Sequence, residues 1–239
     1  MTAAGRRLLP YAERVGHLLE DARRAVRDGD ATSGPLSVGS LETTAALRLS
    51  PLLARFAKAN PNVDLSLKTG TTCELVAQVR DRQLDGAFVC GPVEHPDLSV
   101  IRVYSEELVL LTPPECTDIE TMISAPDLKI IVLRAGCSYR LILEAVLARR
   151  GIVGARVVEF GTLETIISCV SAGLGMTLLP KALIGPVWAG HRVGLHPLPN
   201  GEGRVDKVFI QHREAYATAA LRRFLELVHP EPVGIHSAE

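Results

Sequence analysis

The chain has 239 residues, of which 47% are hydrophobic and 22% charged, enough to bury a core in one large or two modest α/β domains. Its 26 basic and 27 acidic residues give a formal net charge of -1, which excludes an overall attraction to nucleic acid or to an anionic membrane. The longest apolar runs are of strand length, far short of the roughly 20 residues of a membrane helix, so no membrane partner is predicted. The first residues lack the apolar core of a signal peptide, which favours a cytoplasmic location.

Residues 4–28 predict one amphipathic helix that precedes the rest of the fold. Its apolar positions follow a near-heptad spacing, and arginines and acids occupy the other face. The stripe consists of Leu8, Tyr11, Ala12, Val15, Leu18, Leu19, Ala22, Ala25 and Val26. Such a stripe needs a partner, and we favour the same helix of a second copy over packing on the helix's own domain. Residues 28–35 are rich in Gly, Asp and Ser, which indicates a hinge.

From residue 36 onward, period-two and helical patterns alternate, which predicts a largely parallel sheet covered by helices. The expected strands are 36–39, 63–69, 86–90, 99–104, 107–112, 129–133, 155–160, 175–179, 205–211 and a weaker one at 192–196. The expected helices are 41–59, 73–82, 139–150, 163–172 and 216–228. The last strand and helix have no partner in the second series, so we place them back in the first lobe.

Four apolar runs end on glycine and are followed at once by hydroxyl or thiol residues and a helical pattern. These corners are Val38-Gly39-Ser40, Gly70-Thr71-Thr72, Gly136-Cys137-Ser138 and Gly161-Thr162. A strand that ends in this way presents free backbone N–H groups at a helix N-terminus, where a carboxylate or phosphate is favoured. Two corners in each half of the chain predict two lobes that face each other across a cleft for a small anionic molecule.

The candidate ligand-binding residues belong to these corners or adjoin them. They are Ser40, Thr43, Thr71, Thr72, Cys90, Cys137, Ser138 and Thr162. The alternative for the hydroxyl residues is a purely structural role as helix caps, and for Cys90 it is packing in the core, which we favour. Arg134 and Arg140 flank the third corner and could clamp an anion, although we favour a solvated surface position for at least one of them.

Catalysis and metal binding have little support in the sequence. The five cysteines are an odd number in unrelated sequence settings, which indicates reduced thiols. None of the seven histidines has a second His or Cys at the spacing of a metal site. A nucleophile elbow and a Walker A loop are both missing, and Gly173-Leu-Gly175 joins a helix to a strand, the reverse of a dinucleotide-binding turn. We therefore predict a sensor that is not an enzyme and has no metal or cofactor.

Several segments, in order along nearly the whole chain, resemble the LysR-type transcriptional regulators. They are residues 2–14 (TAAGRRLLPYAER), 51–63 (PLLARFAKANPNV), 84–89 (LDGAFV), 135–140 (AGCSYR), 161–166 (GTLETI) and 170–180 (VSAGLGMTLLP). The resemblance implies an effector-binding domain of the type 2 periplasmic-binding-protein kind, with two Rossmann-like α/β lobes after a linker helix. The expected domains are residues 1–33 for the helix and hinge, 34–104 plus 205–239 for lobe 1, and 105–204 for lobe 2.

The resemblance also implies a homodimer or homotetramer, and DNA binding only through a winged helix-turn-helix of about sixty residues ahead of the linker helix. Here that module is missing, so the chain is expected to be either a piece of a longer regulator, which we favour, or a regulator that has lost its operator-binding part. Effector binding would change the angle between the lobes and so move the linker helices.

Two alternatives remain open at this point. A cytoplasmic solute-binding protein would share the two-lobed cleft. A single-cysteine redox sensor would use Cys137, since a helix N-terminus between two arginines favours a thiolate. The peroxide-sensing members of the resembled family use a second, resolving cysteine nearby, and positions 138–168 contain none.

Overall fold

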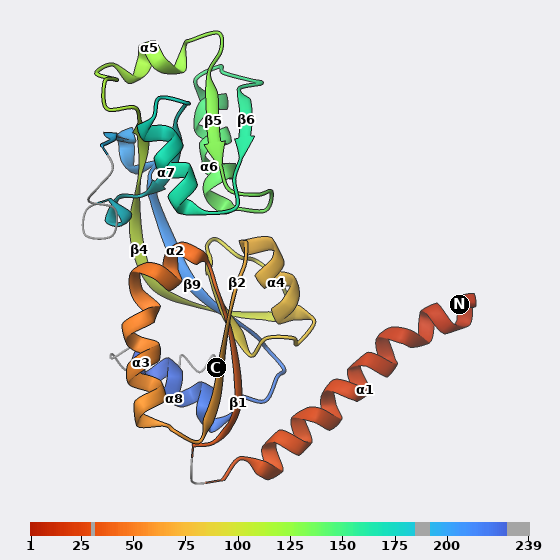
Figure 1. Ribbon diagram of the computed structural model, residues 1–239. Helices are drawn as coiled ribbons and strands as arrows, with labels where there is room; N and C mark the ends of the chain where they lie inside the picture. The colour runs from red at the N-terminus through yellow and green to blue at the C-terminus, as the bar shows by residue number, and fades with distance from the viewer. Residues whose placement is uncertain (30–31, 185–191, 229–239) are drawn as a thin grey trace.

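The computed structural model describes residues 1–29, 32–184 and 192–228. Figure 1 shows a long N-terminal helix, α1, that extends away from two α/β lobes stacked one above the other. The 3-10 turns are Lys181–Leu183 and Pro199–Gly201. Across these described ranges, no helix combines the length and the hydropathy needed to span a bilayer.

Helix α1 (Ala3–Arg27) presents its two faces to different surroundings. Its polar face contacts the first lobe, where Arg24 pairs with Asp85 and the lobe's Arg82 pairs with Asp21 at 2.5 Å. The apolar stripe points away from the lobes and is exposed: Leu8 64%, Tyr11 70%, Val15 58%, Leu18 68% and Leu19 59%. The helix therefore touches its own domain through ion pairs and leaves its heptad stripe uncovered.

The first lobe is a sheet with helices on both sides. Strands β1 (Gly34–Ser40), β2 (Val63–Thr69) and β3 (Gly86–Cys90) are parallel, and β9 (Arg204–His212) lies antiparallel beside β3. Helices α3 (Ser50–Ala59) and α8 (Ala219–Val228) lie together on one side and α4 (Thr72–Arg80) on the other (Figure 1). Edge-to-face contacts among Phe56, Phe88, Phe209 and Phe224 fill the core between the sheet and the first two helices.

The helix expected over 41–59 is not a single regular α-helix. It consists of α2 (Glu42–Thr44), a π-helical turn (Ala45–Leu49) and α3. Pro51 lacks the N–H that a continuous α-helix would donate to Leu47, and the backbone N–H of Ser50 bonds to Ala45 one residue further back than usual. The proline therefore accounts for the widened turn, which the helical spacing alone does not reveal.

The second lobe has a smaller sheet. Strands β5 (Lys129–Val132) and β6 (Arg156–Glu159) are parallel, and an isolated bridge from Ile130 to Met176 connects β5 to the start of β7 (Thr177–Pro180). Strand β8 (Gly194–Pro197) pairs with the strand that precedes α5, as described below. The helices are α5 (Ile119–Ile123), which the sequence did not predict, α6 (Ser138–Arg149) and α7 (Leu163–Ser171).

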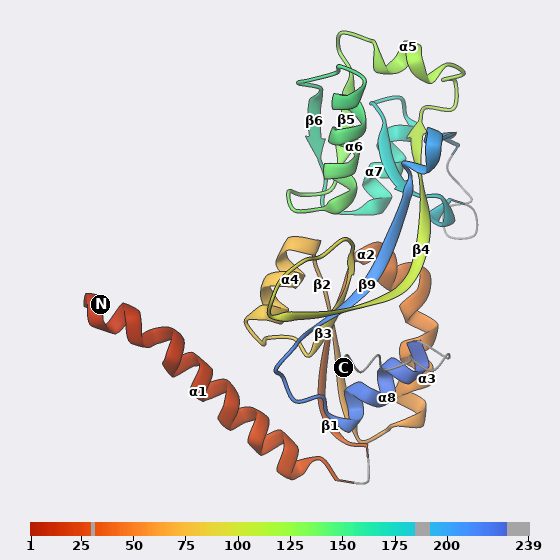
Figure 2. The same cartoon turned by 180° about the vertical axis from the view of Figure 1, so that it is seen from behind.

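A single long strand, β4 (Leu98–Thr112), belongs to both lobes, where the sequence predicted two separate strands. Its first part pairs with β9 as far as Glu107, and its last part pairs with β7 and β8 from Leu108 to Thr112. The register shifts between Arg102 and Tyr104, which bends the strand without ending it. Figure 2 shows β4 and β9 running together from one lobe into the other, so these two strands form the crossover.

Candidate functional site

A cavity of about 230 Å³ lies between the lobes. Three of the four strand-to-helix corners found in the sequence line it, and from the first corner only the residues that follow Ser40 do so. Its lining is Leu41, Glu42, Thr43, Thr69, Gly70 and Thr71 from the first lobe, and Leu133, Arg134, Cys137, Ser138, Tyr139 and Gly161 from the second. The volume and the mixture of polar and apolar groups suit a small organic molecule.

Three hydrogen bonds cross from lobe to lobe beside this cavity. Thr43 and Tyr139 join their hydroxyls at 2.9 Å, and Ser138 donates to Thr72 at 2.8 Å. Arg134 donates to Glu74 at 2.9 Å. All the second-lobe partners lie within residues 134–139, so one loop and the first turn of α6 hold the second lobe against the first.

The loop before α6 requires glycine at 136. Gly136 has φ +89°, and a Cβ atom there would lie 3.0 Å from the Thr71 hydroxyl. A side chain at this position would therefore be strained in the backbone and would press against the opposite lobe. The third corner of the sequence thus fits directly against the second one.

The helix N-termini near the cavity differ in how their amides are used. At α4, Thr71 and Glu74 form a capping box, in which the Thr71 N–H donates to Glu74 at 2.8 Å. That amide bond lowers the pKa of the Glu74 carboxyl, and the Arg134 guanidinium adds to the effect. At α6, by contrast, no side-chain cap is found among the described residues. The first amides of α6 therefore have no oxygen cap, and those of Tyr139 and Arg140 interact with the Cys137 sulfur.

A buried ion pair lies behind the cavity, on the crossover strands. Lys207 of β9 is fully buried, and its ammonium lies 2.8 Å from the carboxylate of Glu106 on β4. Tyr139 bridges both, because it accepts from Lys207 at 2.7 Å and donates to Glu106 at 2.6 Å. Burial, followed by the Glu106 carboxylate, raises the pKa of Tyr139 well above its ordinary value, so the phenol keeps its proton.

Sequence reasoning missed these three residues. Lys207 falls between Val205 and Phe209 on the inward period of a strand, and a charge at an inward position was the available signal. Glu106 lies in the gap left between two predicted strands, where polar residues looked like a turn. Tyr139 directly follows the third corner, in which Ser138 was the last predicted binding residue.

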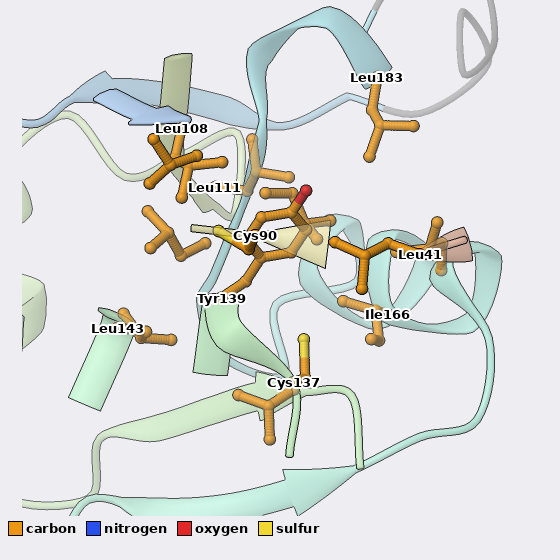
Figure 3. Close-up of a cluster of buried hydrophobic side chains, with 14 of the residues drawn as sticks. Leu41, Cys90, Leu108, Leu111, Cys137, Tyr139, Leu143, Ile166 and Leu183 are labelled. Carbon is orange, nitrogen blue, oxygen red and sulfur yellow. The ribbon is translucent and has the colours of Figure 1, made fainter. Parts of the chain in front are cut away.

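The cysteines nearest the cavity are buried thiols. All five cysteines are free, and Figure 3 shows Cys90 and Cys137 within the same cluster of leucine, isoleucine and tyrosine side chains. Burial raises the pKa of Cys137 and of Cys90 above the ordinary thiol value. The local sequence predicted the opposite shift for Cys137, because it showed the helix N-terminus and the arginines but not the apolar cover.

The predicted binding residues fall into two groups. Thr43, Thr71, Cys137 and Ser138 line the cavity. The other four lie elsewhere: Ser40 is buried and donates to Leu41 at 3.0 Å, Thr72 accepts from Ser138, Cys90 is in the core, and Thr162 is an exposed cap of α7. The binding roles of all eight stay predictions.

The two flanking arginines are both engaged in ion pairs. Arg134 lines the cavity and pairs with Glu74, whereas Arg140 pairs with Glu144 at 3.0 Å and with Glu159 at 2.9 Å. Arg140 therefore lies on the α6–β6 surface, and only Arg134 of the two arginines lines the cavity. In the described part of the chain, no cluster of His, Cys, Asp and Glu is arranged to hold a metal ion.

Comparison with known proteins gives one consistent result. The family model of the LysR substrate binding domain matches residues 29–232. The HTH-type transcriptional regulator GltR of Bacillus subtilis is 41% identical over 225 residues, which cover 94% of this chain and 76% of that protein. The relatives are regulators, in agreement with the prediction that the chain is not an enzyme.

Solved structures agree on the fold. The regulatory domain of Synechocystis PCC6803 CcmR in complex with 2-PG has a TM-score of 0.71 at 20% identity, covering 82% of this chain and 96% of that one. The effector binding domain of QuiR in complex with shikimate has a TM-score of 0.69 at 16% identity, covering 82% and 96%. The predicted fold, two α/β lobes of the periplasmic-binding-protein kind after one long helix, is confirmed.

The buried thiols generate the first prediction. Under mild alkylation with iodoacetamide at neutral pH, exposed Cys73 should react well before Cys137 and Cys90, because burial disfavours their thiolates and blocks access. Peptide mass spectrometry over time measures each site. Preferential labelling of Cys137, abolished in Cys137→Ser, would contradict this order and restore the redox interpretation.

The ion pair generates the second prediction. Lys207→Met leaves Glu106 buried without its partner and should lower the free energy of unfolding by about 3–5 kcal/mol, whereas Glu106→Gln/Lys207→Met should recover much of the loss. Urea denaturation measures both variants. The control is Arg149→Met, which removes the more exposed Arg149–Glu202 pair and should cost no more than about 1 kcal/mol. Equal losses in all three variants would be the contrary result.

Proposed function

The chain belongs to the LysR-type transcriptional regulators through their substrate-binding domain, and on that premise we propose that the cavity between the lobes is its effector site. The domain is the effector-sensing part of such a regulator. The observation that carries the proposal is that three of the four strand-to-helix corners, and the residues directly after the fourth, line one cavity. We assign binding first to Thr43, Thr71, Cys137 and Ser138, and give Ser40, Thr72, Cys90 and Thr162 supporting places around them.

The proposed effector is a small organic anion. The amides that begin α6 border a cavity in which Arg134 supplies a positive charge. Glu42 opposes an anion, but burial raises the pKa of its carboxyl. A protonated Glu42 would add a hydrogen-bond donor to the same site.

The relay in this proposal runs through the crossover strands to α1. We take residues 34–104 plus 205–239 as lobe 1 and 105–204 as lobe 2, which is supported by the change of partners of β4 near residue 107. A change of interlobe angle on binding would move lobe 1, and the pairs of α1 with Asp85 and Arg82 would carry that motion into residues 1–33.

Self-association through α1 is part of the same proposal. The exposed stripe from Leu8 to Val26 repeats at heptad spacing and faces away from the lobes, so it suits the α1 helix of a second copy in a homodimer or homotetramer. DNA contact belongs, in this proposal, to a winged helix-turn-helix. A near-neutral charge of -1 gives the lobes no general attraction to DNA. The cytoplasm is the compartment we propose, from the odd number of cysteines.

Neither alternative function gains support. A solute-binding protein shares the fold but not the family, and its relatives would not be transcriptional regulators. A redox sensor built on Cys137 needs an accessible thiolate, whereas burial raises the pKa of this thiol.

The third prediction concerns ligand binding and its pH dependence. In a thermal-shift screen of small organic acids that includes shikimate, a binder at a hundred times its Kd should stabilise the protein by about 2.7 kcal/mol. Its affinity, measured by titration calorimetry, should rise as pH falls toward the raised pKa of Glu42, because protonation removes a negative charge from the cavity.

Glu42→Gln tests the pH dependence. This variant should bind the same acid more tightly near neutral pH and lose that part of the pH dependence. The matched control is Glu164→Gln, which alters an exposed acid in the first turn of α7, away from the cavity, and should leave binding unchanged. Binding that weakens in Glu42→Gln would argue against an anion at this position.

The fourth prediction concerns α1. Val15→Glu/Leu18→Glu places charges in the exposed stripe, so a dimer should become a monomer of 25.7 kDa, and a tetramer a dimer. Size-exclusion chromatography with light scattering measures the mass. Glu13→Gln, on the same helix but outside the stripe, is the control and should keep the wild-type mass. An unchanged mass in the double variant would refute self-association through this stripe.

A further inference from the structure

We propose that the cavity selects a hydroxylated carboxylate, and that the buried Glu106–Lys207 pair sets this preference by fixing the hydrogen-bonding role of Thr43. The inference rests on the proposed effector site and names the chemical class that the site accepts. It follows from the number of protons available at each hydroxyl of the network and the direction in which each one is donated.

The Lys207 ammonium can only donate, and the Glu106 carboxylate can only accept. Tyr139 therefore accepts from Lys207 at 2.7 Å and gives its single proton to Glu106 at 2.6 Å. The third contact of the Tyr139 oxygen is Thr43 at 2.9 Å. Since Tyr139 has no second proton, Thr43 must be the donor in this contact.

Thr43 lines the cavity, and its only hydroxyl proton is committed to Tyr139. Toward a ligand, the Thr43 oxygen can therefore only accept. Ser138, on the opposite lobe, is in the same position, because it lines the cavity while donating to Thr72 at 2.8 Å. Two hydroxyl oxygens from opposite lobes can thus only accept hydrogen bonds from the ligand, so they favour a ligand with donor groups.

Several other polar groups of the cavity are donors, which suit an acceptor on the ligand. Arg134 and the first amides of α6 are donors, and they suit a carboxylate. A ligand that satisfies both sets carries an acid group and at least one separate donor. A hydroxyl fits that donor better than an ammonium group, because Thr43 bonds to the same Tyr139 oxygen that already accepts from the Lys207 ammonium.

The test compares acids that share a carbon skeleton and differ in the donor groups they carry. Malate, succinate and aspartate carry a hydroxyl, a hydrogen and an ammonium at the same carbon, and shikimate with 1-cyclohexene-1-carboxylate forms a ring pair with and without hydroxyls. Titration calorimetry on the full chain should show the hydroxylated member binding roughly ten-fold more tightly, since the other leaves acceptor oxygens unpaired.

Two variants test the origin of the preference. Thr43→Val, nearly equal in shape, should bring the ratio of affinities within each pair close to one while leaving the non-hydroxylated acid unaffected. Tyr139→Phe frees the Thr43 proton without removing its oxygen, so it should also reduce the ratio, although Thr43 itself is unchanged. A merely structural role would weaken both acids equally. Thr121→Val, on the exposed helix α5 and outside the cavity lining, is the matched control and should keep the wild-type ratio.

The outcomes separate the two proposals. If succinate binds as well as malate, or aspartate binds better, the inferred hydroxyl preference is wrong while the anion site stands. If the ratio survives in both Thr43→Val and Tyr139→Phe, the preference does not come from this network and the inference is overturned. If none of the five acids nor any other acid of the screen binds at millimolar concentration, the anion site itself is refuted.

Discussion

The buried pair of Lys207 and Glu106 is the interaction on which the arrangement of the lobes depends. An ammonium group without access to water is tolerated only beside an opposite charge with good geometry, and here that charge comes from the neighbouring strand of the crossover. Tyr139, on α6 of the second lobe, hydrogen-bonds to the pair, and Thr43 of the first lobe hydrogen-bonds to Tyr139. One network of four side chains therefore connects both crossover strands with the two helix starts that border the cavity.

The periodicity of the sequence was sufficient for the strands and helices other than α5, but not for their continuity. Strand β4 was divided into two because Ser105 and Glu106 interrupt its apolar pattern. These residues are polar for tertiary reasons, since Ser105 bonds to Asp206 and Glu106 pairs with Lys207 across the crossover. The π-helical turn before Pro51 was hidden in the same way, because apolar spacing reports which face is buried and not which amide bonds to which carbonyl.

The candidate site shows where local chemistry is a reliable guide. Glycine corners correctly indicated which chain segments meet, because a strand end that feeds a helix has a fixed geometry wherever it occurs. They did not indicate the state of the side chains. Cys137 is covered by apolar neighbours and Arg140 is held by Glu159, and both facts depend on residues distant in sequence. The role of Thr43 depends on Lys207, 164 positions further along the chain, and no local motif contains that information.

The shared strands β4 and β9 have a consequence for how such a domain is inherited. Each lobe takes part of its sheet from a strand that also serves the other lobe, so a genetic exchange that cut between the lobes would leave two incomplete sheets with open edges. Recombination that respects the fold must therefore transfer both lobes as one cassette. New ligand preferences in this lineage are expected to arise by point substitution around the cavity, and not by shuffling one lobe against another.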